Sequence, residues 1–572
     1  MRRAVVFVVA LGCRPRSSPP THPAPRGVAH APVAPDAPVA PDACTGVDNA
    51  LGVRLRPGFC MKPIASGLLR PRQMALAPDG DVLVAESGAG WRHNRGRVTA
   101  LHPNADGSFT PTVLVTGLDR PHGIAVRDGY VWVAEAGRIA RFAYPPQGTP
   151  ALETVVGALP ADGRHPHKTL GFAPDGTLFF SIGSGTDNCQ ARGGGQTPDP
   201  CPEREGPFGG QFVCNVTPGT ADDPCPGQMV PPSMERGVVM RWDAARRRAT
   251  VFSHGLRNNL GLAWHPATGR LWGVENARDY IDRADATLSD AALPHDELNE
   301  LTEGSDHGWP YCYDDNTPSP EYRAGGARCR TRRAPAVNLP AHAAPISIAF
   351  YDGRMFPEAY RGSAFITYHG YRANGHRVVV VPFGVDGRVA GAPEDFIAGW
   401  EEAPGRPHGH LLGLLVARDG SLLLTDDVQG AVYQVRYGLS ALHAPPPPLV
   451  APPVEDPAEV ERRCADVARR GDPLSVMQRT VIDTKCVSCH ASSPGGLLLR
   501  RCDWRTTYES LAHGRSAAYG AYVVPGRVEE GVLMARLRGD TMGPRMPMQG
   551  VELTAEERAA VEAWVRAGAP SP

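Results

Sequence analysis

The chain has 572 residues, more than the roughly 250 to 300 residues that one hydrophobic core supports, so several domains are expected. Its 59 Lys and Arg residues nearly balance its 60 Asp and Glu residues. The net charge of -1 provides no global field that would recruit nucleic acid or an anionic membrane surface, and we expect no nucleic-acid partner. With 64 Gly and 58 Pro residues, the body is expected to be soluble and rich in turns.

The N-terminus has the order of a secretory signal, with Met-Arg-Arg followed by an apolar stretch from Ala4 to Leu11. The end of this segment, Ala-Leu-Gly-Cys13, resembles the lipobox of bacterial lipoproteins, in which the cysteine becomes lipidated. We therefore predict a signal peptide over residues 1–13, a periplasmic location and a membrane tether through Cys13. Ordinary cleavage and secretion remain the alternative.

Two segments are predicted to be extended linkers. Residues 14–43 are rich in Pro, Ala and His with almost no large apolar side chains, so they cannot bury a core. A run of prolines after Ala444 is typical of a polyproline segment and marks the main domain boundary. These breaks define a first domain over residues 44–440, a linker over 441–463 and a second domain over 464–572.

The first domain contains a repeated pattern of an apolar stretch, a turn (usually Asp-Gly) and a second β-forming stretch. Each Asp-Gly supplies the positive φ of a tight hairpin, and the flanking alternation gives each strand one buried face. Six such hairpins, separated by insertions, predict a mainly β fold, a six-bladed β-propeller; a β-sandwich or barrel is the alternative. The copies occupy residues 74–86, 124–135, 170–181, 262–273, 348–368 and 414–425.

The second domain contains the motif Cys486-Val-Ser-Cys489-His490, which follows a segment with helical spacing of apolar residues from Leu474 to Ile482. Two thiols can add to the haem vinyl groups while the adjacent histidine ligates the iron. A bare Cys-x-x-Cys is more often a zinc or redox site, but a second cysteine pair at zinc spacing is absent from the sequence. We therefore predict a small α-helical cytochrome c domain with covalent haem c.

A methionine-rich loop precedes the last helix of this domain. Thr554 and Glu557 form a capping box at the start of that helix, which resembles the closing helix of small cytochromes c. We predict Met546 as the sixth iron ligand because the family pattern is Met followed by Pro; Met542 and Met548 are alternatives, as is a core-packing role. Such a site carries electrons to a downstream acceptor and performs no substrate chemistry.

Thirteen cysteines in an exported chain suggest disulfide bonds. If Cys13 carries lipid and two cysteines carry haem, ten remain. Proximity in the sequence favours Cys44–Cys60, Cys312–Cys329 and Cys464–Cys502. The pairing among Cys189, Cys201, Cys214 and Cys225 stays open.

From about residue 60 to 437 the chain resembles the six-bladed propeller dehydrogenases that use pyrroloquinoline quinone (PQQ), the soluble glucose and sorbosone dehydrogenase superfamily. The resemblance rests on short segments that occur in the family order. They are residues 165–176, 255–263, 275–279, 296–299, 307–310, 405–407 and 419–420.

The resemblance implies roles for several residues. His165 stands where the family has its general base, with His167 as the rival, and an imidazole suits proton removal near neutral pH. Arg257 and Asn258 match a pair that contacts PQQ.

Further family positions are less sharply aligned. Arg372, Arg377 and Arg406 are candidates for additional PQQ contacts. The carbonyl groups of Ala277 and Arg278 occupy the calcium-binding positions, and Ca²⁺ prefers oxygen ligands.

One departure bears on the substrate. The glucose-oxidising branch has an Asp that orients the catalytic His, whereas Ser184 stands at that position here, so the sorbosone-like branch is nearer. The sequence therefore predicts oxidation of a sugar or other alcohol by PQQ with electron transfer to haem. A non-enzymatic binding propeller with a cytochrome domain and a calcium-dependent, lactonase-type hydrolase are the alternatives.

Overall fold

The structure is a computed structural model. It describes residues 44, 53–88, 93–104, 107–161, 164–185, 187, 203–205, 211–213, 236–320, 329–370, 372, 374–400, 409–438, 457–487, 497, 499–516, 520–539, 546 and 553–571. The expected signal peptide, the first linker and the proline run after Ala444 lie outside these residues.

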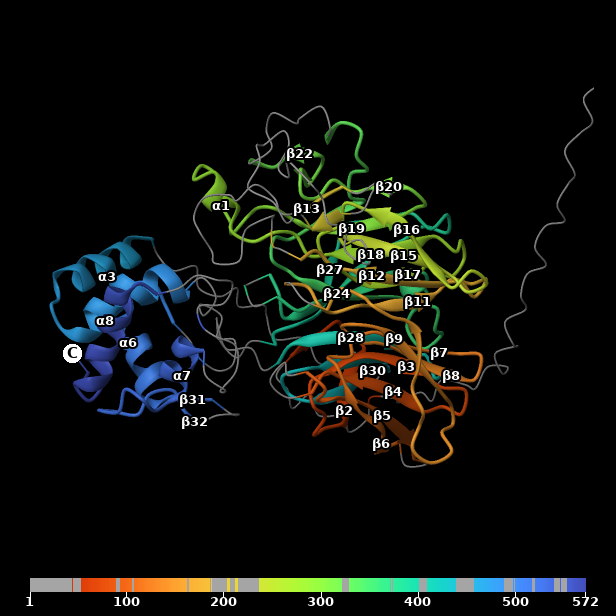
Figure 1. Cartoon of the computed structure of the whole chain (residues 1–572), viewed down its shortest axis with the longest axis horizontal. Coiled ribbons are helices and arrows are strands. Elements are labelled where there is room, and N and C mark those ends of the chain that lie inside the picture. Colours follow the sequence, from red (N-terminus) through yellow and green to blue (C-terminus); the bar gives the residue numbers. More distant parts are fainter. Residues whose placement is uncertain are drawn as a thin grey trace, which may run out of the picture. The chain divides into compact units, whose positions relative to one another are not determined.

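Six antiparallel sheets follow one another along the first domain (Figure 1). The first is β3 (Pro71–Leu76), β4 (Val82–Glu86), β5 (Gly96–Pro103) and β6 (Phe109–Leu118). The second is β7 (Ile124–Arg127), β8 (Tyr130–Ala134), β9 (Ile139–Ala143) and β10 (Glu153–Val156). The third is β11 (Leu170–Phe172), β12 (Leu178–Ile182), β15 (Val238–Asp243) and β16 (Arg248–His254), with β20 (Ser305–Asp306) added in parallel.

The remaining sheets have the same plan. The fourth is β17 (Asn259–Trp264), β18 (Leu271–Glu275), β19 (Asp296–Leu301) and β23 (Val337–Leu339). The fifth is β24 (Pro345–Phe350), β25 (Ala364–Tyr368), β26 (Arg377–Val381) and β27 (Glu394–Ala398), with β1 (Arg54–Leu55) at its edge. The sixth is β28 (Leu411–Val416), β29 (Leu422–Asp426), β30 (Ala431–Tyr437) and β2 (Phe59–Ala65).

Smaller elements lie between strands of the same blade. They are helix α1 (Ile281–Ala284), the 3-10 turn η3 (Glu358–Tyr360), and the short strand pairs β13 (Glu203–Glu205) with β14 (Gln211–Val213) and β21 (Cys312–Tyr313) with β22 (Thr317–Pro318).

The predicted hairpins are the first two strands of the six blades. The first strands of successive blades contact one another in a ring, as the propeller prediction requires. Gly80, Gly176 and Gly420 in the Asp-Gly turns have φ values of 103°, 94° and 82°, which favour glycine. The mainly β, six-bladed propeller is confirmed, and the sandwich alternative is wrong.

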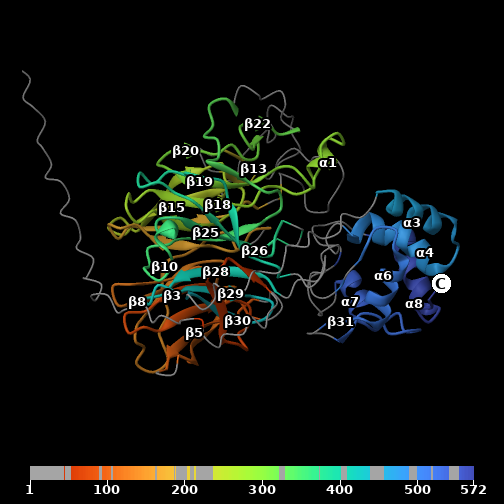
Figure 2. The same ribbon diagram turned by 180° about the vertical axis from the view of Figure 1, so that it is seen from behind.

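Strand β2 closes the ring because it pairs with β30 as the outermost strand of the last blade. Figure 2 shows β28, β29 and β30 of this blade side by side. Phe59 of β2 packs edge-to-face on Phe356 and Phe396, with ring centroids 4.8 Å away in both pairs. These contacts, each worth about 0.5 to 1.5 kcal/mol beyond area burial, join β2 of the sixth blade to the fifth blade.

The C-terminal segment is helical. It consists of α3 (Pro457–Arg469), α4 (Pro473–Met477), the π-helix η5 (Gln478–Cys486), α6 (Trp504–Tyr508), the π-helix η7 (Glu509–His513), α7 (Val532–Arg538), α8 (Ala555–Arg566) and the short pair β31 (Arg515–Ser516) with β32 (Gly520–Ala521). Helix α3 begins inside the range 441–463 that we assigned to the linker. The predicted capping box is present, with Thr554 accepting from the Glu557 amide at 3.1 Å and donating its own amide to Glu557 at 2.8 Å.

Three disulfide bonds confirm the pairs predicted from proximity: Cys44–Cys60, Cys312–Cys329 and Cys464–Cys502. The first ties the segment before β1 to β2, and the last ties α3 to the turn before α6. The four cysteines of the 188–234 insertion lie outside the described residues.

Candidate active site on the propeller

The predicted residues His165, Arg257 and Asn258 gather at one edge of the blades, where the inner strands begin and the second strands end. His165 precedes β11 and Ser184 follows β12, while Arg257 and Asn258 precede β17. Because the inner strands of a propeller all run in the same sense, residues far apart in the sequence meet at this edge. We call this edge the axial site.

His165 is oriented through its Nδ1 atom, which lies 2.9 Å from both the carbonyl oxygen and the Oγ of Ser184. The carbonyl can only accept, so Nδ1 carries the proton and Nε2 keeps its lone pair. Burial, then the positive charges of Arg257 and Arg164, hold the pKa of His165 well below its usual value. His165 is therefore a neutral imidazole with a basic Nε2 at neutral pH.

Gly183 allows this arrangement. A Cβ on Gly183 would lie 2.6 Å from the Cβ of His165 and 3.0 Å from the Oδ1 of Asn258, so a larger residue would displace one of them. The Nδ2 of Asn258 donates to the Oδ1 of Asn276 at 3.1 Å. The end of β12 thus sets the spacing between the two predicted residues.

Arg257 is buried, and its guanidinium is anchored by protein acceptors. Nε donates to the carbonyl of Asp187 at 2.8 Å, Nη1 donates to the carbonyl of Asn276 at 2.9 Å, and Nη2 pairs with the Asp187 carboxylate. A guanidinium has five N–H groups, so the anchoring leaves donors for a ligand. Asp187 was not predicted, because only the fold brings it to Arg257.

A second group of charges surrounds Asp279. Its carboxylate contacts Arg164 at 2.5 Å and the Nδ1 of His342 at 3.1 Å. The Nε2 of His342 lies 3.4 Å from Asp290 Oδ1, and Asp290 also accepts from Arg372 at 2.7 Å. Arg372, predicted to bind PQQ, therefore already has a carboxylate partner.

The stability contribution of His342 is expected to depend on pH. Burial lowers its pKa, but hydrogen bonds to Asp279 and Asp290 outweigh burial and raise the pKa to about 9. The stabilisation is therefore fully present below about pH 6.5 and is lost as pH rises through about 9, with an upper value of roughly 3 kcal/mol. Denaturant unfolding should show that His342→Asn lowers the free energy of unfolding at pH 6 and has little effect at pH 10.

Asparagine is the suitable replacement because His342 has a φ of 57°, which Asn tolerates. His513→Asn, at an exposed position of the helical segment, serves as the control and should give no pH-dependent difference. An equal loss at both pH values would contradict the prediction.

The predicted calcium residues line a small cavity. Ala277 and Arg278 border a space of about 20 Å³ together with Glu275 and Glu297, enough for roughly one water-sized occupant. Burial raises the pKa of Glu275 to about 8, and burial together with the Glu275 charge raises the pKa of Glu297 well above its usual value. The amide of Ala277 donates to Asp296 at 2.7 Å, which fixes this loop.

A further polar cluster at the axial site involves histidines. Arg72 donates to the Nδ1 of His122 at 3.1 Å and to Asp427 at 2.8 Å, and Asp427 also lies 3.2 Å from the Nε2 of His369. His122 is buried and neutral, since burial and the Arg72 charge lower its pKa. Because Nδ1 accepts, Nε2 carries the proton, and this donor has no hydrogen-bond acceptor within the described part of the chain.

The rival base His167 is buried beside His122 of this histidine cluster, and the two ring centroids are 5.5 Å apart. Its pKa is held well below the usual value by burial and by the charges of Arg72 and Lys168. Arg406 lies outside the described residues. His122 was not predicted from the sequence; it lies two residues before β7, whereas His165 lies five residues before β11.

In the helical segment, Cys486 and Met546 pack against the same hydrophobic core, which includes Leu474, Ile482 and Trp564. Cys486 is the last residue of η5, and the amide of Met546 donates to the carbonyl of Arg536 at 2.8 Å. Cys489, His490, Met542 and Met548 lie outside the described residues.

Among the residues described, no group of three or more His, Cys, Asp or Glu side chains is arranged to hold a metal ion. No helix in the described ranges is long and apolar enough to cross a membrane.

The first domain has the fold of a six-bladed propeller, and it is similar in sequence to a PQQ-dependent sugar dehydrogenase. The profile of the TrAA12-like family matches residues 243–436. A crystal structure of the Trichoderma reesei family AA12 enzyme, determined with iodide, superposes with a TM-score of 0.51 at 20% identity, covering 68% of this chain and 98% of that one. At this identity the likeness shows the fold alone.

Two relatives extend the comparison. The PQQ-dependent sugar dehydrogenase of Hypocrea jecorina is 23% identical over 362 residues, which cover 57% of this chain and 74% of the relative. An uncharacterized protein of Borreliella burgdorferi is 28% identical over 214 residues, covering 36% of this chain and 54% of the relative. The chain thus matches about half the length of the Borreliella protein.

Proposed function

We propose that the chain is an exported quinohaemoprotein dehydrogenase, in which the propeller oxidises a sugar or other alcohol with PQQ and a haem c receives the electrons. The observation that carries the proposal is the neutral His165, whose Nε2 remains basic beside the buried cation Arg257. The similarity to a PQQ-dependent sugar dehydrogenase supports the assignment of the substrate class.

The residues of the axial site fit the chemistry of PQQ, a tricarboxylate with a quinone. The unsatisfied N–H of His122 and the remaining donors of Arg257 are each suited to carboxylate or quinone oxygens, and Asn258 follows Arg257 in the chain. When bound, PQQ would supply the carbonyl that accepts a hydride from the substrate.

The protein's own part in the reaction is proton removal and orientation. Nε2 of His165 would take the proton of the substrate hydroxyl, while Ser184 holds the ring through Nδ1. The anchored Arg257 keeps a fixed positive charge next to the reacting group, where it favours developing negative charge on oxygen. Asp279 offsets part of this field at His165.

We also propose that Ca²⁺ binds near Ala277 and Arg278. The residue set is chemically apt, because Ala277, Arg278 and the two acids Glu275 and Glu297 line one small cavity, and Ca²⁺ prefers carbonyl and carboxylate oxygens. The raised pKa values of these two acids indicate that the cavity disfavours two uncompensated negative charges, which a cation would relieve.

The helical segment is the proposed cytochrome c domain. Haem would be attached through Cys486 and Cys489, with His490 and Met546 on the iron; the shared core position of Cys486 and Met546 supports this. A one-electron carrier suits a two-electron quinone, and a downstream respiratory acceptor would complete the transfer. Three disulfides fit the proposed periplasmic location, with the lipidated Cys13 as a tether.

The test is reconstitution of the purified full chain with PQQ and CaCl₂, followed by a panel of aldoses and polyols, while the haem absorption band is monitored. Reduction of the haem by a sugar or polyol is expected, and treatment with EGTA before reconstitution should abolish it. Lactone hydrolysis without haem reduction would instead establish the hydrolase alternative. Failure of the propeller to bind PQQ would favour the alternative of a non-enzymatic binding propeller.

A further inference from the structure

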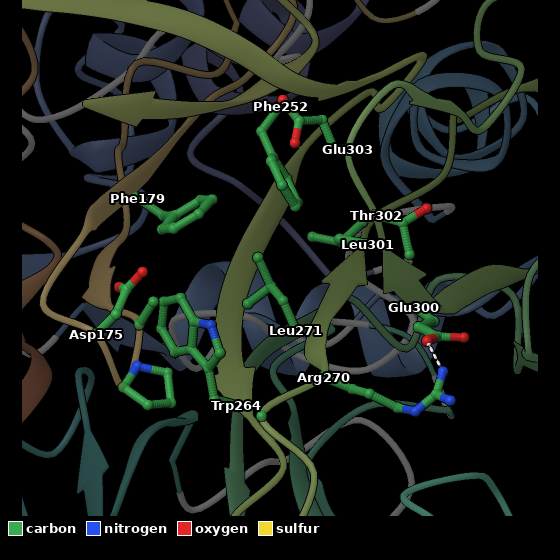
Figure 3. A pocket seen from close by; sticks show the side chains of 13 residues that line it. Asp175, Phe179, Phe252, Trp264, Arg270, Leu271, Glu300, Leu301, Thr302 and Glu303 are labelled. Carbon is green, nitrogen blue, oxygen red and sulfur yellow. Dashed lines mark hydrogen bonds and ion pairs between the residues drawn. The ribbon is translucent and has the colours of Figure 1, made fainter. Parts of the chain in front are cut away.

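A groove of about 530 Å³ lies between the third and fourth blades (Figure 3). It includes Asp175, in the turn between β11 and β12, and Gly269, in the turn between β17 and β18. His165 and Arg257 precede the opposite ends of these inner strands, so the groove lies at the far edge of the blades from the axial site.

The floor of the groove is apolar and aromatic. Phe179 packs edge-to-face on Phe252 and on Trp264, with ring centroids 4.9 Å and 5.7 Å away, and Leu271 and Leu301 complete the floor. Figure 3 shows these five side chains around one space. The edge-to-face contacts hold the rings in place, so the floor is rigid before any ligand arrives.

The rim of the groove consists of charged groups held in pairs. Glu300 pairs with Arg270 and accepts from Arg333 at 2.6 Å, while Arg241 donates to both oxygens of Glu303 at 2.7 Å and 3.1 Å. These pairs place planar hydrogen-bonding groups at fixed positions and leave the rim with little net charge.

We propose that this groove binds a neutral saccharide. A pyranose ring has an apolar C–H face that can lie on the aromatic floor and a periphery of hydroxyls that can bond to the paired carboxylates and guanidinium groups. The volume lies within the range of about 300 to 1,000 Å³ for small-molecule sites, and the open groove suits a stretch of an oligosaccharide. The paired rim does not favour a strongly charged ligand.

The site lies outside the proposed redox centre and needs no PQQ. It would hold a carbohydrate chain against the protein while the axial site acts on a sugar or alcohol group. The proposal therefore goes beyond the proposed dehydrogenase activity, and its test is separate.

The experiment is calorimetric titration of the full chain, without added PQQ, with cellohexaose, maltohexaose and laminarihexaose. At least one should bind, and Trp264→Ala should weaken that binding about tenfold or more, whereas Trp264→Phe should retain most of it. Arg270→Ala and Glu303→Ala, each of which removes one member of a rim ion pair, should each weaken binding several-fold. Trp504→Phe, a similarly half-buried Trp in the helical segment, is the matched control and should leave the binding unchanged.

Absence of binding by all three hexasaccharides would overturn the proposal. So would binding that survives Trp264→Ala and both rim substitutions, or binding that is lost in Asn258→Ala, because Asn258 belongs to the axial site. Trp264-dependent binding in a chain that oxidises no sugar would support the saccharide site and would contradict only the proposed dehydrogenase activity.

Discussion

Replacing His165 by asparagine is expected to lower kcat for sugar oxidation by about two to four orders of magnitude in the reconstituted protein, the usual contribution of a general base. Asparagine can still donate to the Ser184 carbonyl, but it offers no basic atom in place of Nε2. PQQ affinity, followed by the absorbance of the bound quinone, should change little. This combination separates a catalytic role from a role in binding.

The pH dependence gives a second measurement on the same residue. The pKa of His165 lies well below its usual value because of burial and the nearby arginines, so its basic form persists below about pH 6.5. We expect kcat to stay level on acidification past that pH and to fall only at more acidic values. His167→Asn is the matched control and should keep this profile; a collapse of kcat in His167→Asn with retention in His165→Asn would reverse the assignment.

The propeller fold could be predicted from the sequence because each blade repeats the same local sequence pattern. In residues 170–181 an apolar stretch, an Asp-Gly turn and a second apolar stretch lie within twelve residues, and their hairpin needs no distant contact to form. The closing pair of β2 with β30 was not predicted, because its partners are hundreds of residues apart and only the completed ring selects them. The start of α3 was also missed, since the break was placed from proline content alone.

In the axial site, too, some residues could be predicted from the sequence, whereas others depend on contacts between distant segments. His165 and Ser184 could be singled out from the family resemblance, and the hairpin between them brings the start of β11 and the end of β12 together. Asp187 and Asp279 could not, because their roles follow from two arginines of other loops whose charge must be balanced in a buried place. Ser184 departs from the aspartate of the glucose-oxidising branch, and Asp279 provides a more distant carboxylate that raises the pKa of His165.

Removal of both thiols of the Cys486-Val-Ser-Cys489 motif is expected to abolish covalent haem attachment, because each thioether needs its own sulfur and one vinyl group, whereas a variant that lacks one thiol retains at most one thioether. In the double variant Cys486→Ser with Cys489→Ser, haem should be lost from the denatured chain on a gel stained for haem. The propeller should still reduce its bound PQQ with sugar, since the axial site contains neither cysteine. Sugar-driven reduction of the haem band should disappear.

The variant Met546→Ala tests the predicted sixth ligand of the haem iron. Loss of a thioether ligand, which stabilises ferrous haem, should lower the reduction potential by roughly 100 mV or more, measured by redox titration. The haem should remain covalently attached. Met542→Ala and Met548→Ala are matched controls from the same loop and should leave the potential nearly unchanged. If one of these controls carries the full drop instead, the ligand is that methionine, and the packing of Met546 against the core has only a structural role.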